Sequence, residues 1–391
     1  MSNQGIHPKK QRIGVIGGGQ LAWMMAMEAQ ELGMELVVQT PKLTDPAVTI
    51  ALNPVLAPVA DPAGTQILSD RCDVITFENE FVDLSALNRL ETAGTLFRPR
   101  LQALEPLLDK YTQRQFLAAH GLPNPPYVTL DANVADEVVH ELAGSLGFPL
   151  VLKTRRLGYD GQGTFILRSA DELLQTWSHL NRPPVLLEAF IPFEKELAVM
   201  VARSLTGDIA VYPVVETQQV DQVCRRVFAP AQVAPAVGHT VDAIARTLIT
   251  QLDFVGVLGI ELFLAPGNKV LVNEVAPRTH NSGHYTLNAC ETSQFAQQLL
   301  AVSGQPLSSP AMTCDRALMV NLLGFENANS DYAKQRQLLA QIPNAHVYWY
   351  GKQESRPGRK LGHVTVCYEK NEEGREIAQH IEATWYPAAN S

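Results

Sequence analysis

Two glutamates on a short predicted hairpin are the residues whose spacing says most about chemistry. The segment GIELFLAPGNKVLVNEVAPR has two apolar runs on either side of PGNK at residues 266–269, a good turn sequence. If residues 265 and 270 pair across that turn, Glu261 lies opposite Glu274 on one face. At roughly 5 Å and an effective dielectric near 20, these charges repel by about 3 kcal/mol. The hairpin therefore predicts a bound cation, and hard carboxylate oxygens favour Mg²⁺.

Asn273 offers a further oxygen ligand beside Glu274. Strict alternation along a strand places its side chain on the opposite face, so it joins the site only if the strand is bulged or twisted there. The alternative is that both glutamates face bulk water, as side chains of antiparallel sheets commonly do. The apolar residues around Glu261 and Glu274 favour the metal, and we predict these three residues as its ligands.

A lysine and a glycine-rich loop upstream indicate a site for phosphate groups. Lys153 ends an apolar strand, and the loop GYDGQGT at residues 158–164 leads directly into the next strand. The loop lacks the Walker A pattern, but flexible glycines can fold backbone N–H groups over phosphates while a lysine supplies positive charge. A simple turn between strands is the alternative. Further on, the extended linker LEAFI (187–191) can pair its backbone with adenine, and Glu196 can bind ribose hydroxyls.

The N-terminal segment GGGQLA (17–22) satisfies the dinucleotide pattern G-x-G-x-x-A between a strand and a helix. A nicotinamide dehydrogenase would also carry an acidic residue at the end of the second strand, but that strand ends in Gln39 and Thr40. NAD binding is therefore disfavoured. Anion binding at the helix N-terminus and a tight turn without a ligand both stay open.

The elements that position these residues form three predicted units of mixed α/β and α+β class. Alternating strands and helices predict a parallel, Rossmann-like domain over residues 1–108. Strands dominate a larger domain at 109–310, and a small α+β domain occupies 311–391. A length of 391 residues suits two or three domains.

Composition excludes several classes of function. The net charge of −9 disfavours nucleic acid as a partner, and no apolar run approaches the roughly 18 residues that cross a bilayer. Five scattered cysteines, with no C-x-x-C pair, fit reduced thiols in the cytoplasm. Against this acidic background a basic cluster stands at 352–360, which is either a site for a small anion or a solvated loop; its members are Lys352, Arg356, Arg359 and Lys360.

Taken in order, the strand lysine, the glycine loop, the linker with its glutamate and the Glu-x12-Asn-Glu hairpin resemble an ATP-grasp enzyme. The run VAPRTHNSGHYT (275–286) is similar to the signature of the N5-carboxyaminoimidazole ribonucleotide synthetases. GGGQL near the N-terminus, YGK (350–352) and RPGRKLGH (356–363) are similar to that family too, so the resemblance spans about residues 12 to 370. It implies an ATP-grasp fold with an N-terminal Rossmann-like domain and a small C-terminal domain.

The resemblance also implies a reaction, in which bicarbonate and ATP give carboxyphosphate and the amine of 5-aminoimidazole ribonucleotide captures the carboxyl group. ATP and Mg²⁺ are the implied cofactors, and a cytoplasmic homodimer is the implied assembly. By position, ATP binding is implied for Lys110, Lys153, Gly158, Tyr159, Asp160, Gly161, Gln162, Gly163, Thr164, Glu188, Ala189, Phe190, Ile191, Glu196, Gln219, Asn273 and Glu274. Catalysis is implied for Arg278, Asn281, Asp160 and Lys352, and ribonucleotide binding for Gly18, Gly19, Gln20, Glu78, His280, Ser282, His284 and Arg359.

Several positions depart from the family pattern, which keeps other functions open. They are Ala22, Trp23, Leu157, Gln162, Thr164, Gln219 and Thr279. A related ATP-grasp ligase with another acceptor, such as a formate-dependent glycinamide ribonucleotide transformylase, is one alternative. An ATP-binding protein that no longer catalyses is another. A zinc site at His280 and His284 is disfavoured, because the H-E-x-x-H pattern is absent.

Overall fold

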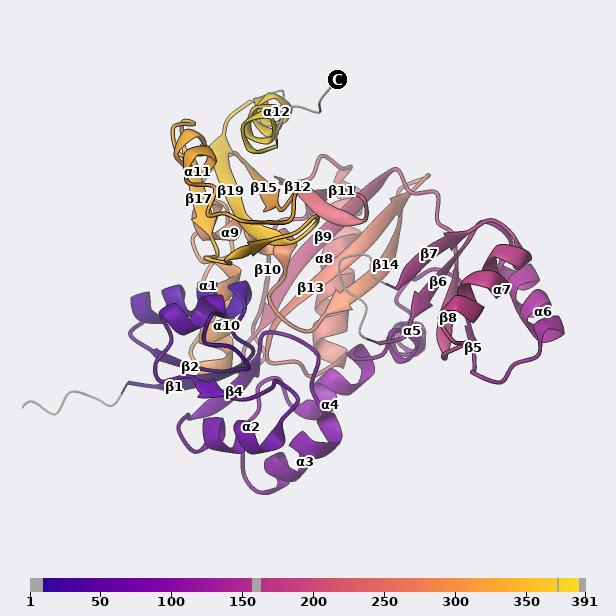
Figure 1. Ribbon diagram of the computed structural model, residues 1–391, viewed down its shortest axis with the longest axis horizontal. Helices are drawn as coiled ribbons and strands as arrows, with labels where there is room; N and C mark the ends of the chain where they lie inside the picture. The colour runs from indigo at the N-terminus through magenta and orange to yellow at the C-terminus, as the bar shows by residue number, and fades with distance from the viewer. Residues whose placement is uncertain (1–9, 157–162, 371–372, 387–391) are drawn as a thin grey trace, which may run out of the picture.

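The computed structural model describes residues 10–156, 163–370 and 373–386 (Figure 1). Its N-terminal part is a parallel four-stranded sheet in the order β3-β2-β1-β4, as the alternating pattern predicted. Apolar residues of β1 are buried between helices on both faces, which is why this strand reads as a continuous apolar run. The elements are β1 (Arg12–Ile16), α1 (Gln20–Glu31), β2 (Glu35–Thr40), η1 (Pro46–Thr49), β3 (Val55–Leu56), α2 (Pro62–Ser69), β4 (Val74–Phe77) and α3 (Leu84–Thr92).

A small antiparallel sheet in the order β5-β8-β6-β7 forms the second part, with α6 and α7 packed on one face (Figure 1). Leu152, Leu173 and Trp177 are fully buried between that face and the helices. The sheet carries Lys153 at the end of β6 and Glu188 on β8. Its elements are β5 (Tyr127–Leu130), α6 (Asp136–Leu146), β6 (Leu150–Thr154), β7 (Thr164–Leu167), α7 (Ala170–His179) and β8 (Val185–Ala189).

The third and largest sheet runs β14-β13-β9-β11-β12-β15-β19-β17, with β10 paired to β9. Because β12 pairs with β15, the sheet continues across residue 310, where the sequence suggested a boundary. Helix α8 (Pro235–Gln251) packs against β9, and α12 (Glu373–Trp385) against β15. The strands are β9 (Lys195–Arg203), β10 (Ile209–Val211), β11 (Val215–Val220), β12 (Val223–Ala229), β13 (Gly256–Ala265), β14 (Lys269–Ala276), β15 (Arg316–Leu323), β17 (Ala345–Trp349) and β19 (Lys360–Tyr368).

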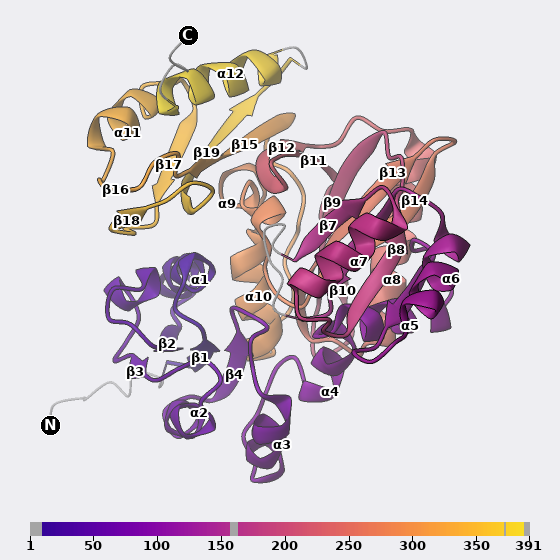
Figure 2. The same ribbon diagram turned by 45° about the vertical axis from the view of Figure 1, so that its right-hand side comes forward.

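Two helices join these parts. The helical stretch after residue 100 is divided into α4 (Leu101–Leu104), η2 (Glu105–Leu107) and α5 (Lys110–Ala119), because Asp109 caps a new helix through Tyr111 N–H at 2.9 Å. Helix α10 (Gln294–Ser303) lies between α1 and β13 (Figure 2), and every residue from 294 to 302 is buried.

Short elements complete the description: η3 (Asn281–Gly283), α9 (Thr286–Ala289), β16 (Ala328–Asn329), α11 (Ala333–Leu339) and β18 (Glu354–Ser355). In the part of the chain that the structure describes, no helix combines the length and apolarity needed to span a membrane.

Candidate active site

The two glutamates of the β13–β14 hairpin lie directly opposite each other, which confirms the predicted pairing of Glu261 with Glu274. The predicted pairing of residues 265 and 270 is wrong, because Ala265 pairs with Lys269 across a tighter turn. A register shift next to Glu261 absorbs the difference, since Leu262 pairs with Val272 and one residue of β14 is left over. That extra residue is Asn273, so β14 has the bulge that the sequence argument required.

The bulge brings the Asn273 side chain to the lysines of the site. Lys153 Nζ donates to Asn273 Oδ1 at 3.0 Å, and Lys110 Nζ lies 2.6 Å from Glu274 Oε1. Lys110 is the first residue of α5 and Lys153 the fourth of β6, so two separate elements converge on the end of β14.

The two glutamates have opposite electrostatic environments. Burial, reinforced by Glu274 and Glu196, raises the pKa of Glu261 to about 7. Burial opposes ionisation of Glu274 as well, but Lys110 and Lys153 outweigh it and lower its pKa. A facing carboxylate pair in which burial and like charge raise the pKa of one member suits a divalent metal, because a cation offsets both effects.

Within the described residues, no cluster of three or more His, Cys, Asp or Glu side chains forms a self-sufficient metal site. Glu261, Glu274 and the amide of Asn273 offer oxygens only. This donor set fits Mg²⁺, which commonly takes one or two carboxylates and completes its shell with water and substrate phosphates.

A buried ion cluster supports Lys153. Its Nζ lies 2.8 Å from Glu188 Oε2, and Arg114 Nε lies 2.5 Å from Glu188 Oε1. Although burial opposes it, the charges of Lys153 and Arg114 lower the pKa of Glu188 to about 2. The Glu188 carboxylate is thus committed to the protein, and its backbone lies on β8 between β5 and β6.

Glu196 shares a sheet face with Glu261. It stands on β9 two residues before Ala198, the partner of Glu261. Burial raises the pKa of Glu196 to about 7, and Gln219 Nε2 donates to its Oε1 at 3.1 Å. The two residues proposed for the nucleotide therefore contact each other.

The glycine turn at the start of α1 encloses a carboxylate of the protein itself. A Cβ on Gly17 or Gly19 would collide with the Glu78 carboxylate, which lies against the backbone N–H groups of Gly19 and Leu21. Burial nevertheless raises the pKa of Glu78. In this structure the helix N-terminus faces Glu78 in place of an exogenous anion.

Arg278 connects the signature segment to the N-terminal sheet. Its Nε lies 2.7 Å from Glu80 Oε2, and its Nη2 donates to Glu80 Oε1 at 3.2 Å. Nearby, His280 Nε2 lies 3.6 Å from Glu261 Oε1. His280 thus lies beside the pair of facing glutamates.

The C-terminal part contacts the glycine turn at the start of α1 through Lys352. Its Nζ donates to Gln20 Oε1 at 3.0 Å and to the Lys360 carbonyl at 2.8 Å. Arg359 Nη1 donates to the Glu354 carbonyl at 2.7 Å on the same loop. Part of the basic cluster therefore faces the glycine turn.

Two of the predicted substrate contacts are buried side chains. Ser282 is 1% exposed and its hydroxyl pairs with His280 Nδ1 at 2.8 Å, while His284 is fully buried against Phe295. Both side chains are buried in this structure, and their predicted contact with the ribonucleotide stays a prediction. Asn281 is also buried, and its amide exchanges hydrogen bonds of 2.9 and 2.7 Å with Asn321.

Residues 157–162 of the glycine loop lie outside the described residues. These include the predicted contacts Gly158, Tyr159, Asp160, Gly161 and Gln162. At its end, Thr164 pairs with Lys153, and the Gly163 carbonyl accepts from Thr154 N–H at 2.8 Å. The described end of the loop therefore lies beside Lys153.

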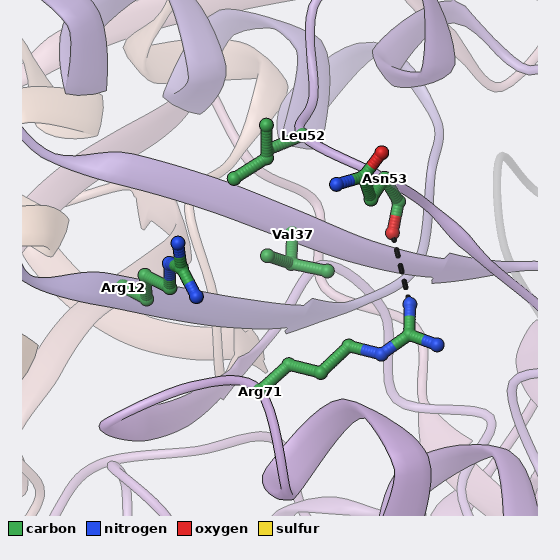
Figure 3. Close-up of a pocket in the computed structure, with 5 residues that line it drawn as sticks. All are labelled: Arg12, Val37, Leu52, Asn53 and Arg71. Carbon is green, nitrogen blue, oxygen red and sulfur yellow. Dashed lines mark hydrogen bonds between the residues drawn. The ribbon is translucent and has the colours of Figure 1, made fainter.

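A surface pocket of about 420 Å³ lies elsewhere, lined by Arg12, Val37, Leu52, Asn53 and Arg71 (Figure 3). Arg12 begins β1, whereas the glycine turn follows its end, so this pocket sits at the opposite edge of the sheet. It contains none of the residues predicted for chemistry.

Sequence reasoning missed Gln113, Arg114 and Glu80. Two signals were present: Arg114 follows Lys110 by four residues and therefore shares its helix face, and Glu80 follows a parallel strand at its carboxyl end.

Comparisons with known proteins agree with this arrangement. Family models match for a ribonucleotide synthetase preATP-grasp domain at residues 10–106, an ATP-grasp domain at 115–295 and a phosphoribosylaminoimidazole carboxylase C-terminal domain at 317–377. The chain is 57% identical to an N5-carboxyaminoimidazole ribonucleotide synthase of Synechococcus elongatus, over 96% of this chain and 95% of the relative. It is 50% identical to the Synechocystis enzyme of the same name, over 98% and 100%.

Solved structures are similar over nearly the whole fold. An N5-carboxyaminoimidazole synthase from Aspergillus clavatus, in complex with ADP and 5-aminoimidazole ribonucleotide, superposes with a TM-score of 0.89 at 30% identity, over 96% of this chain and 98% of that one. An N5-carboxyaminoimidazole ribonucleotide synthetase in complex with ADP superposes with a TM-score of 0.88 at 33% identity, over 96% and 97%. The chain therefore belongs to the N5-carboxyaminoimidazole ribonucleotide synthase family of ATP-grasp ligases.

Proposed function

We propose that this enzyme carboxylates 5-aminoimidazole ribonucleotide to N5-carboxyaminoimidazole ribonucleotide, using ATP and bicarbonate, in purine biosynthesis. The observation that carries the proposal is the facing pair Glu261 and Glu274, with Asn273 turned toward Lys153 by the β14 bulge. The relatives bear this enzyme's name, and one similar structure contains ADP and the ribonucleotide.

ATP is proposed to lie between the small sheet and the large one. Lys153, Lys110 and the loop at 158–164 would contact its phosphates, since fixed positive charge and backbone N–H groups suit them. Residues 188–191 would meet adenine through their backbone, while Glu196 and Gln219 would take the ribose hydroxyls. Support comes from the convergence of Lys110 on Glu274 at 2.6 Å and of Lys153 on Asn273 at 3.0 Å.

Mg²⁺ would be held by Glu261, Glu274 and Asn273. When bound, it would neutralise phosphate charge and cancel the repulsion between the two glutamates. The rise in the Glu261 pKa to about 7 supports this assignment, because a carboxylate that resists ionisation alone is stabilised by a cation.

The ribonucleotide is proposed to bind where three parts of the chain meet. Gly18, Gly19, Gln20 and Glu78 would line it from the N-terminal sheet, and Arg278 and His280 from the signature segment. Lys352 and Arg359 would reach it from the C-terminal loop, and the Lys352 contact to Gln20 at 3.0 Å supports this convergence. Guanidinium and ammonium groups suit its phosphate.

The chemistry follows in two steps. A bicarbonate oxygen attacks the γ-phosphorus of ATP, and the bond from that phosphorus to the oxygen bridging the β-phosphate breaks. ADP departs, and carboxyphosphate is formed. The exocyclic nitrogen of the ribonucleotide then bonds to the carboxyl carbon, inorganic phosphate departs, and the amine loses a proton. Arg278 and Lys352 are proposed to hold the charged oxygens during transfer. Asp160 and Asn281 are proposed to position the acceptor. Because Asn281 is buried and bonded to Asn321, it would act through that hydrogen bond.

An acceptor-dependent assay tests the proposal. Purified protein is expected to release phosphate from ATP much faster when 5-aminoimidazole ribonucleotide is added with bicarbonate and Mg²⁺. A panel of other acceptors, including glycinamide ribonucleotide with formate, is the control. No stimulation by the aminoimidazole would refute the proposal. Stimulation by another acceptor would indicate a different ATP-grasp ligase, and ATP binding without any turnover an impaired one.

We propose further that the enzyme is a cytoplasmic homodimer with domains at 1–108, 109–310 and 311–391. None of the five cysteines, all of which the structure describes, forms a disulfide, which agrees with a reducing compartment. Sedimentation velocity of the purified chain tests the dimer, and a monomer at micromolar concentration would refute it.

A further inference from the structure

Strand β14, which carries Asn273 and Glu274, lies at one end of the nine-stranded sheet. An edge strand presents backbone groups that no neighbouring strand pairs, and a bulge loosens its ladder further. A metal site built on a bulged edge strand therefore needs support from outside the sheet, because small movements of the backbone redirect the ligands.

Helix α5 supplies that support through two buried side chains. Gln113, 3% exposed, accepts from Val275 N–H at 3.0 Å and donates to the Val275 carbonyl at 3.1 Å. Arg114 donates to the carbonyls of Val272 and Asn273 at 3.2 and 2.5 Å. These bonds flank the bulge on both sides, so the backbone around Asn273 and Glu274 is held from Val272 to Val275.

The same helix also carries Lys110, whose ammonium group contacts Glu274 directly. One rigid element thus sets both the backbone of β14 and the cation beside its carboxylate. We propose that Gln113 is a positioning residue for the metal and nucleotide site, acting through the Val275 backbone on Glu274. This inference rests on the proposed role of Glu274 in holding Mg²⁺.

The chain offers a matched control. Gln297 on α10, fully buried, donates to the Ser308 carbonyl at 2.7 Å and accepts from Ser308 N–H at 3.0 Å. Like Gln113, it bonds both the N–H and the carbonyl of one residue, here on a loop that carries none of the proposed site residues. Both variants lose the same two hydrogen bonds and gain a buried methionine, so Gln297→Met controls for the loss of a glutamine that bonds a backbone N–H and carbonyl. Because Ser308 is exposed and Val275 is buried, the structural cost should be smaller for Gln297→Met.

The experiment compares Gln113→Met, Gln297→Met and the wild-type chain. Mn²⁺ replaces Mg²⁺ as the probe, and its affinity in the presence of ADP is measured by isothermal calorimetry, with thermal unfolding and steady-state kinetics alongside. Gln113→Met is expected to weaken Mn²⁺ binding by about 10- to 100-fold and to lower kcat, because loss of the groups that orient a metal ligand typically has an effect of this size. Gln297→Met is expected to unfold at a lower temperature with unchanged Mn²⁺ affinity.

Unchanged Mn²⁺ affinity in folded Gln113→Met would overturn the inference, as would an equal loss in both variants. If Gln113→Met does not fold, Gln113→Asn decides in its place, because its amide stays neutral and is one methylene shorter, so it cannot reach both backbone groups of Val275. An intermediate loss of Mn²⁺ affinity in that variant then supports the inference, and an unchanged Mn²⁺ affinity refutes it. A wild-type chain that binds Mn²⁺ but lacks turnover would overturn the proposed function alone.

Discussion

Replacing Glu261 by glutamine should stabilise the metal-free protein while removing its activity. Burial and the neighbouring Glu274 raise the pKa of Glu261 from 4.5 to about 7 in the folded chain. Because the folded pKa exceeds the unfolded one, the contribution of Glu261 to stability is complete below about pH 4.5. It is lost as the pH rises through about 7.

The size of this loss follows from the pKa difference. At about 1.4 kcal/mol per pKa unit, the difference between 4.5 and about 7 corresponds to about 3 kcal/mol. The side chain is 27% exposed, so little of this figure is removed by solvent. A neutral amide carries no such penalty. Glu261→Gln should therefore exceed the wild type in free energy of unfolding by about 3 kcal/mol at about pH 8.5.

Urea unfolding in EDTA measures the effect at about pH 5 and pH 8.5. The advantage of the variant should be small at the lower pH and should grow toward the higher one. Adding Mg²⁺ and ATP should reverse the order, because only the wild type gains from binding. A variant that is no more stable than the wild type at about pH 8.5, or an advantage independent of pH, would refute this electrostatic account.

Three further changes probe the rest of the site. Lys153→Met leaves Glu188 with Arg114 alone, so we expect a loss of about 2 kcal/mol in urea unfolding and little ATP binding by calorimetry; unchanged stability would contradict the buried cluster. For Glu196, the pKa of about 7 predicts that KM for ATP falls as the pH rises through 7, and Glu196→Gln should abolish that dependence; a variant with the same pH profile would exclude the role. Arg278→Lys loses the two-bond contact to Glu80, and KM for the ribonucleotide should rise about tenfold with KM for ATP unchanged; the reverse pattern would count against the proposed binding place.

The pairing of Glu261 with Glu274 could be predicted because strand alternation and a turn sequence are local properties. The turn length was mispredicted by one residue, since PGNK supports more than one hairpin register. The bulge that cancelled this error could be stated only as a condition, because it depends on α5, which lies some 160 residues earlier in the chain.

Contacts between residues far apart in the chain could not be predicted either, because they also depend on how distant segments pack. Nothing local links Arg278 to Glu80 or Lys352 to Gln20, yet the structure joins them at 2.7 and 3.0 Å. Burial was likewise not visible in the sequence, so that His284, four residues after the partly exposed His280, lies inside the core.

By itself, then, the sequence determined the elements, their order and the type of chemistry, because hydrophobic period, glycine placement and residue type act over short stretches. Tertiary structure alone decided which charges are paired, which are buried and how the bulged strand is held. Those properties arise where segments distant in the chain pack together and exclude water. There the pKa of each group and its contacts depend on spatial neighbours that a local sequence pattern cannot identify.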